Sequence, residues 1–213
     1  MSDRSSATHL VVIGTAAVVK QRQWTALRLI AEHAPGTAPA PVSADLAADP
    51  PTVVMSRLPG VPLSEPVGVE QAAAVARTVV QVQKAVPRAI LADRLTRTAA
   101  PVFGTGDGNV ADWLWDGSQA RLVDFEYSGL SDRAYELAEM VEHISVRQRD
   151  GTALVRALEQ VASAESDASR LLDCRRLHAL FWLLRILGSG QGRSPRGSVD
   201  LAAQATRVLN LLG

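Results

Sequence analysis

Residues 104–138 read GTGDGNVADWLWDGSQARLVDFEYSGLSDRAYELA, and this stretch decides the fold. Its centre holds Asp116-Gly117, a dipeptide that favours the tight turn of a β-hairpin. The residues on either side predict two strands, at residues 113–115 and 120–124. The stretch therefore predicts a hairpin that begins and ends next to acidic side chains.

Four carboxylates should meet at the open end of this hairpin. Asp112 precedes the first strand and Asp124 ends the second, the preceding loop carries Asp107 to the same end, and Glu126 lies just beyond. Carboxylates held this close repel and raise each other's pKa unless a cation lies between them. The cluster could therefore bind a divalent metal or a basic partner, or keep one carboxyl protonated for acid/base chemistry. Solvated loop acids are the simpler alternative.

Hydrophobic patterns predict the elements around the hairpin. Short β-branched runs indicate strands at residues 10–13 and 52–55, and a Pro/Ala-rich connector over residues 37–51 leads into the second of them. Helices are expected at residues 18–33, 69–86, 131–147, 152–164, 167–187 and 198–212, with a shorter one within 88–100. A small strand-containing N-terminal portion thus precedes a larger helical portion, which is an α+β fold.

Composition limits the partners and the compartment. The 213 residues carry 22 Lys+Arg and 22 Asp+Glu, so the net charge is zero, and no basic stripe is present. We therefore expect no nucleic acid and no membrane as a partner. Cys174 is the single cysteine, which rules out an intrachain disulfide, and the apolar stretch at residues 177–187 is too short to span a bilayer. These features predict a soluble cytoplasmic protein.

Side chains on the hairpin and the following helix could bind a substrate. Trp113 and Trp115 alternate with one leucine, so both indoles share a face, where they could line a pocket for an apolar or aromatic ligand. Packing of both against the helices is the equally simple alternative. His143 falls at helical spacing from Glu136 and Glu139 and could act as a general base or a pH-sensitive ligand, although a hydrogen-bonded core histidine is the simpler interpretation.

Three residues after the hairpin complete the candidates. Tyr127 stands next to Glu126 and could donate a proton near the carboxylates. Arg133 could clamp an anionic substrate, with a solvated arginine as the alternative. Asp132 is placed to cap the N-terminus of the next helix, which is a structural role.

The stretch resembles the catalytic segment of aminoglycoside phosphotransferases and their choline-kinase-like relatives. Their loop has the form H-G-D-x-x-x-x-N, and a metal-binding D-x-[DE] and a G-x-x-D-x-A-x-[DE]-L-A segment follow. Gly106-Asp107 matches the first motif, and Asp124-Phe125-Glu126 matches the second. The third motif is matched by Gly129, Asp132, Ala134, Glu136, Leu137 and Ala138. Residues 53–60 look like the strand that links the two lobes of the family, and the likeness covers most of the chain from about Leu10.

The resemblance implies a shortened protein-kinase-like fold. Residues 1–60 would form a truncated N-terminal lobe with its linker strand, and residues 61–213 a helical C-terminal lobe with the catalytic hairpin. By the same resemblance, Asp107 would accept the proton of a substrate hydroxyl. Asp124 would bind magnesium, and Asp112 would take the place of the asparagine that holds a second metal ion.

The ATP-binding half departs from the family pattern. Thr105 replaces the histidine of the catalytic loop, and no glycine-rich loop precedes the strand at residues 10–13. That strand has no lysine to bind phosphates, and Lys20 falls at the start of the next helix instead. Gln23-Trp24 stands where the helix glutamate is expected. Phosphoryl transfer needs these parts together, so this half of the protein looks degenerate.

Three functions remain open from the sequence. The first is a repurposed, ATP-independent enzyme without a cofactor, whose carboxylates catalyse dehydration, conjugate addition or cyclisation in natural-product biosynthesis, as a lyase or cyclase. The second is an O-phosphotransferase that uses ATP and Mg²⁺ on a small molecule, and the third is a non-catalytic pseudokinase that binds a small molecule. In each case the partner is a small-molecule substrate or ligand, and a homodimer could complete the short lobe.

Overall fold

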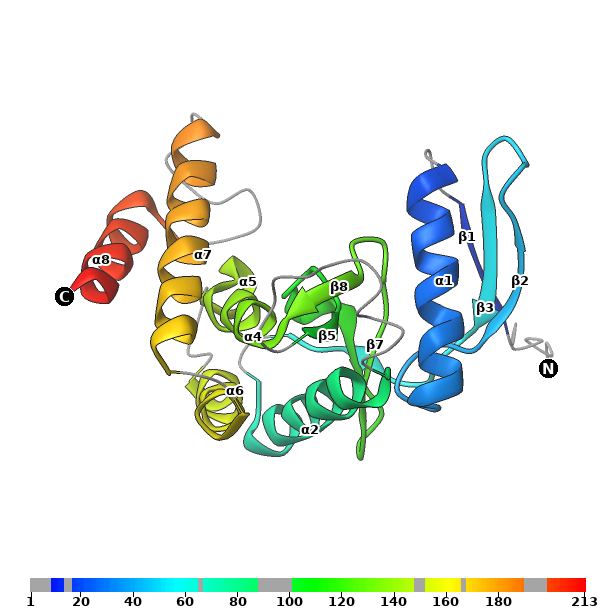
Figure 1. The fold of residues 1–213 in the computed structure, drawn as a ribbon, viewed down its shortest axis with the longest axis horizontal. Helices are drawn as coiled ribbons and strands as arrows, with labels where there is room; N and C mark the ends of the chain where they lie inside the picture. The colour runs from blue at the N-terminus through cyan, green and yellow to red at the C-terminus, as the bar shows by residue number, and fades with distance from the viewer. Residues whose placement is uncertain are drawn as a thin grey trace, which may run out of the picture.

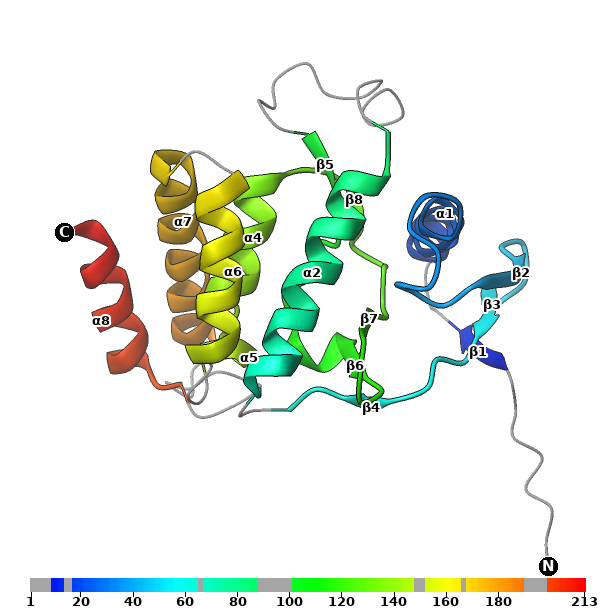
Figure 2. The same ribbon diagram turned by 90° about the horizontal axis from the view of Figure 1, so that it is seen from below.

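The computed structural model describes residues 9–13, 17–64, 67–87, 101–147, 152–165, 168–189 and 199–213. Figure 1 shows a small unit of one helix and three strands on one side of the molecule and a larger, mainly helical unit on the other. We call them the N-terminal lobe and the C-terminal lobe. The segment that follows strand β3 connects them (Figure 2).

The N-terminal lobe is an antiparallel sheet beside helix α1 (Ala17–His33). Its strands are β1 (His9–Ile13), β2 (Pro41–Asp45) and β3 (Thr52–Ser56), in the order β1-β3-β2. Strand β2 lies within the connector predicted from the sequence. It is an edge strand that starts at a proline and has no fully buried residue, so hydrophobic alternation does not reveal it.

Helix α1 is held to the lobe by one apolar face. Ala26, Leu27 and Ile30 recur at helical spacing and are almost completely buried. The helix ends at His33, and Pro35-Gly36 forms the turn that follows it, in which the Thr37 amide donates to the Ala34 carbonyl at 3.3 Å and Gly36 has a φ of +82°. The apolar face fixes the rotation of α1, and hence the direction of its other side chains.

The predicted hairpin is confirmed. Strands β6 (Trp113–Trp115) and β7 (Ala120–Leu122) pair across Asp116-Gly117, and β4 (Val61–Pro62) adds a third strand, in the order β4-β6-β7. Gly60, just before β4, lies so close to the hairpin that a Cβ atom there would be 2.6 Å from the Trp115 carbonyl oxygen. The linker between the lobes is therefore bound directly to the hairpin.

A two-stranded sheet that the sequence did not predict brackets the acidic segment. Strand β5 (Pro101–Gly104) pairs antiparallel with β8 (Gly129–Asp132), and Gly104 is the register partner of Gly129. The loop after β5 therefore starts beside the end of the turn that follows the hairpin. This pairing brings residues 105–109 and 124–128 together.

Helices form the rest of the C-terminal lobe. They are α2 (Val69–Ala85), α4 (Arg133–Glu142), α5 (Ile144–Arg147), α6 (Thr152–Glu165), α7 (Ala168–Gly188) and α8 (Leu201–Leu212). The single helix predicted over residues 131–147 is wrong, because His143 has a ψ of 137° and divides it into α4 and α5. The helix expected within residues 88–100 lies outside the described residues. No helix in the described part of the chain combines the length and the apolar character needed to cross a membrane.

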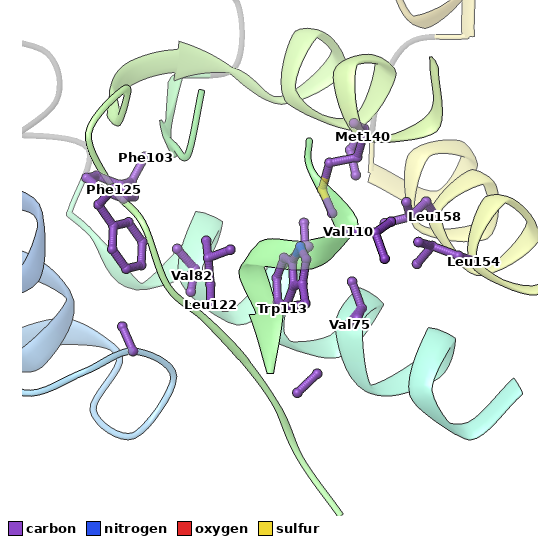
Figure 3. Packing of buried hydrophobic residues seen from close by; sticks show 14 of the residues in the cluster. Val75, Val82, Phe103, Val110, Trp113, Leu122, Phe125, Met140, Leu154 and Leu158 are labelled. Atoms are coloured by element: carbon purple, nitrogen blue, oxygen red, sulfur yellow. The ribbon is translucent and has the colours of Figure 1, made fainter. Parts of the chain in front are cut away.

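The main core joins the hairpin to these helices. Figure 3 shows the Trp113 indole among Val75 and Val82 of α2 and Leu122 of β7, with Met140 of α4 nearby. All five are buried. The hairpin is therefore anchored to the helices, and its acidic end is held in a fixed position.

Candidate functional site

A cavity of about 530 Å³ lies between the two lobes. We call it the interlobe cleft. Its apolar lining consists of Pro39, Met55, Leu58, Leu114 and Val123, and its polar lining of Lys20, Gln23, Ser56, Arg57, Asp124 and Glu126. A volume of this size suits a small molecule or cofactor. Two of the four predicted carboxylates, Asp124 and Glu126, thus face the cleft.

Asp124 is held in an unusual backbone conformation. Its φ is +64°, and it is the one residue other than glycine with a positive φ in the described part of the chain. This region is unfavourable for most side chains and costs about 1–3 kcal/mol, so it persists where the surrounding structure enforces it. The neighbouring Phe125 side chain is completely buried, while Asp124 is exposed. Burial of the phenylalanine therefore directs the aspartate outward into the cleft.

One asparagine joins the other two predicted carboxylates to each other. The Asn109 backbone amide donates to Asp107 Oδ1 at 3.0 Å, and the Asn109 side-chain amide donates to Asp112 Oδ1 at 3.3 Å. The Val123 amide in turn donates to the Asp112 carbonyl at 2.9 Å. Hydrogen bonds thus join Asp107 to Asp112, and Asp112 to the residue before Asp124. The sequence predicted that all four carboxylates meet, but of the four only Asp124 and Glu126 line the interlobe cleft.

Glu136 fixes the loop that carries Asp107. It is buried on α4, and its Oε2 accepts hydrogen bonds from the backbone amides of Thr105 at 2.8 Å and Gly106 at 3.3 Å. Gly106 has a φ of +70°, and a Cβ atom there would be 2.4 Å from the Tyr127 carbonyl oxygen. The loop is therefore held from one side by a carboxylate and packed against the turn on the other.

His143 contacts Asp107 directly. Its Nε2 lies 3.4 Å from Asp107 Oδ1, and its Nδ1 accepts a hydrogen bond from the Ser145 amide at 3.2 Å. Ser145 Oγ lies 2.7 Å from Nδ1 and accepts from the Val110 amide, so Ser145 contacts the ring nitrogen with both its amide and its hydroxyl. The proton of a neutral imidazole must then reside on Nε2, which faces Asp107. His143 is thus a buried, hydrogen-bonded histidine, as the simpler interpretation of the sequence had it, and its Nε2 contacts the Asp107 carboxylate from the end of α4.

Glu139 adds a protonated carboxyl beside this group. Burial, together with the charges of Glu136 and Asp107, raises its pKa from 4.5 to about 8. At neutral pH the side chain is therefore a neutral hydrogen-bond donor rather than a second negative charge.

We expect Glu139→Gln to stabilise the protein at pH 8 and to change little at pH 4.5. The folded state retains this proton between pH 4.5 and about 8 while the unfolded state loses it, so stability falls as pH rises through that window. Glutamine has no proton to lose in this range and removes the loss of stability, which amounts to on the order of 4 kcal/mol at pH 8. Thermal denaturation at both pH values measures it, and a difference that is independent of pH would contradict the assignment.

The structure corrects the prediction that two tryptophans line a substrate pocket. Trp113 is buried in the core, and Trp115 on the same face packs against that core. Leu114, which alternates with them, is the hairpin residue that lines the cleft. Alternation placed both indoles on one face correctly, but it could not tell which face meets the helices.

The remaining predicted residues lie outside the lining of the interlobe cleft. Tyr127 is 58% exposed, and its backbone is the part that contacts the Asp107 loop. Arg133 begins α4 and does not line the interlobe cleft. The predicted cap at Asp132 is confirmed, since its carboxylate accepts from the amides of Ala134 and Tyr135.

Sequence reasoning missed two residues that face the cleft. Lys20 and Gln23 both line it from α1, and both are buried. The two side chains are hydrogen-bonded, with the Lys20 Nζ 2.9 Å from the Gln23 Oε1. Their spacing of three residues, which places them on one helix face, was the available signal.

The carboxylates suit a magnesium ion that arrives with a phosphate ligand. Asp124 and Asp112 supply oxygen donors from adjoining parts of the hairpin. No group of three or more His, Cys, Asp or Glu side chains within the described residues could hold a metal ion. Magnesium is commonly bound by one or two carboxylates together with substrate phosphates, and Asp124 is the predicted metal ligand that lines the cleft.

Comparison with known proteins finds a family match over the part of the chain that contains residues 104–138. A model of the phosphotransferase enzyme family matches residues 81–178, and a search of curated proteins found no match. Among solved structures, a choline/ethanolamine kinase family protein from Mesorhizobium loti aligns with a TM-score of 0.64 at 15% identity, over 97% of this chain and 82% of that one. An aminoglycoside phosphotransferase from Alicyclobacillus acidocaldarius aligns with a TM-score of 0.65 at 13% sequence identity, over 96% of this chain and 84% of that one.

A choline kinase from Streptococcus pneumoniae shares the fold as well. It aligns with a TM-score of 0.61 at 13% identity, over 98% of this chain and 88% of that one. Together with the family match, these structures confirm the resemblance seen in residues 104–138 and the α+β, kinase-like fold.

Proposed function

We propose, from this phosphotransferase fold, that the protein transfers the terminal phosphate of ATP to a hydroxyl group of a small molecule. The observation that carries the proposal is the composition of the interlobe cleft. Met55, Leu58 and Leu114 offer apolar contacts for a flat base, while Lys20 and Asp124 offer charged groups for phosphates and their metal ion. A cleft with both kinds of lining suits a nucleotide better than an uncharged metabolite.

The sequence argument for ATP-independent chemistry rested on several missing parts: the glycine-rich loop, the strand lysine, the helix glutamate and the histidine of the catalytic loop. The strand at residues 10–13 has no lysine, and electrostatic compensation of the phosphates is a large part of catalysis in this reaction class. Lys20 lies in the cleft from the following helix, so the lack of a cation for the phosphates no longer counts against phosphoryl transfer. The family match and the lining of the cleft then favour phosphoryl transfer.

Asp107 is the proposed proton acceptor. In this reaction the hydroxyl oxygen of the acceptor forms a bond to the terminal phosphorus of ATP, the bond to the leaving ADP oxygen breaks, and the hydroxyl proton passes to the Asp107 carboxylate. The Asn109 amide and the Nε2 of His143 hold that carboxylate in place. Asp124 and Asp112 would hold the magnesium ion, which neutralises phosphate charge when bound.

Mg-ATP should stabilise the wild-type protein against heat, and Asp124→Asn should lose that stabilisation. A ligand that binds the folded state at 100 times its Kd adds about 2.7 kcal/mol to the free energy of unfolding. Asparagine tolerates a positive φ, so the variant keeps the turn and removes a metal-binding charge.

The measurement is a thermal melt with MgCl₂ alone, with ATP and EDTA, and with both ATP and MgCl₂. We expect a rise in Tm only for wild type with both. An unchanged Tm at millimolar Mg-ATP would contradict the proposed function.

A further inference from the structure

We infer that Lys20, on helix α1, is the cation that binds the phosphate oxygens of ATP in the interlobe cleft. The inference rests on the proposed function and assigns a residue that the sequence pattern places outside the usual strand. It starts from one observation, a buried ammonium group on the wall of a cavity.

The burial of Lys20 is unusual for a lysine. The residue is 4% exposed, and its ammonium group donates a hydrogen bond to the neutral amide oxygen of Gln23 at 2.9 Å. Transfer of an ammonium group out of water is costly unless a charge of opposite sign compensates it. A neutral amide compensates only part of that cost, whereas a phosphate entering the cleft would supply the missing negative charge.

The position of Lys20 also fits a phosphate bound through magnesium. The cleft that Lys20 lines also contains Asp124 and Glu126. Negative phosphates between Lys20 and a metal ion held at Asp124 would have a cation on both sides. Gln23, itself buried, would keep the lysine side chain pointing into the cleft from the same helix face.

Arg22, the other cation near this part of α1, does not face the interlobe cleft and so does not replace Lys20 in phosphate binding. Its Nη1 donates to the Glu126 carbonyl at 3.3 Å, and it lines a separate cavity of about 570 Å³ on the other side of α1. It therefore attaches α1 to the turn after Asp124, and this contact helps to fix the position from which Lys20 reaches the cleft.

The stability of a Lys20→Met variant without ligand separates a functional lysine from a structural one. If Lys20 serves phosphate binding, its removal relieves an incompletely paired buried charge, so the Tm without nucleotide should stay the same or rise. The Kd for Mg-ATP should at the same time increase at least about tenfold, since an electrostatic clamp on phosphates is lost. Lys20→Arg should recover part of the affinity.

The chain offers a matched control, because Lys84 is its only other lysine. Lys84 lies on α2 and is exposed, so Lys84→Met should leave both the Tm and the Kd for Mg-ATP unchanged. In the wild-type protein, an acyl-phosphate derivative of ATP that acylates nearby amines should label Lys20, and excess ATP should suppress that label. Labelling of Lys84 should not respond to ATP.

The outcomes distinguish this inference from the proposed function. If wild type binds Mg-ATP, Asp124→Asn does not, and Lys20→Met binds as wild type does, the function stands and the role of Lys20 is overturned. If Lys20→Met fails to fold, labelling of wild type decides, and an absent or ATP-insensitive label at Lys20 overturns the role. If wild type binds no Mg-ATP, both fail.

Discussion

Replacement of Asp107 by asparagine should reduce kcat by about 1,000-fold or more while Mg-ATP still binds. The carboxylate accepts the proton from the attacking hydroxyl, and asparagine cannot do so. Asparagine keeps an oxygen that can accept the Asn109 amide, so the loop should retain its shape. Because Asp107 does not line the interlobe cleft, the affinity for nucleotide should change little.

The measurement is single-turnover phosphoryl transfer beside a nucleotide titration. Asp173→Asn is the matched control, since that aspartate is exposed on α7 and pairs with Arg176 at the surface. It should behave as wild type in both assays. An Asp107→Asn enzyme within about tenfold of wild-type kcat would remove Asp107 from the reaction, because general-base catalysis contributes about 100-fold or more.

Glu142→Gln should cause the largest loss of stability of any single substitution proposed for this protein. Glu142 is 1% exposed and holds together three helices of the C-terminal lobe. Its two carboxylate oxygens accept from Arg175 Nε of α7 at 2.7 Å and from Arg207 Nε of α8 at 2.8 Å. Arg147 Nε of α5 lies 3.9 Å from the Glu142 Oε2. Three guanidinium groups thus converge on one buried charge.

Removal of that charge leaves the arginines to repel each other in a partly buried site. Loss of one partner of a buried ion pair costs about 3–5 kcal/mol. Burial alone would raise the pKa of Glu142, but the hydrogen bonds and charge of Arg207, with Arg175 and Arg147, hold it below its usual range. The stabilisation is therefore present above the unfolded pKa near 4.5 and is lost as the pH falls below it.

Chemical denaturation at pH 7 measures this loss, and Glu139→Gln supplies a control on the same helix. Glu139 and Glu142 are one turn apart on α4, yet Glu142 is surrounded by arginines and Glu139 by carboxylates. The same substitution should therefore destabilise at one position and stabilise at the other. A Glu142→Gln variant within about 1 kcal/mol of wild type would show that the cluster contributes no net stability.

The hairpin could be predicted from the sequence because its signals are local. Asp116-Gly117 fixes the turn, and pairing across it brings Asp112 to the backbone of Val123 without any long-range information. The β5–β8 sheet lacked such a signal, since its strands are four residues long, far apart in the chain, and bounded by a proline and glycines. Short strands of this kind are defined by their partner.

The candidate site was predictable where it lies on the hairpin and not where it depends on packing between elements. The bend at His143 depends on hydrogen bonds from Ser145 to its ring, which turn the imidazole toward Asp107. The role of Lys20 depends on how α1 is rotated against the cleft, and periodicity gives the face of a helix but not what that face meets. The core position of Trp113 was open for the same reason.

A crystal structure with magnesium and a non-hydrolysable ATP analogue tests the central claim most directly. The account predicts a base against Met55 and Leu58, phosphates between the Lys20 ammonium and the Asp124 carboxylate, and the terminal phosphate turned toward the loop that carries Asp107. An interlobe cleft that stays free of nucleotide at saturating concentration, or phosphates that point away from both Lys20 and Asp124, would contradict it.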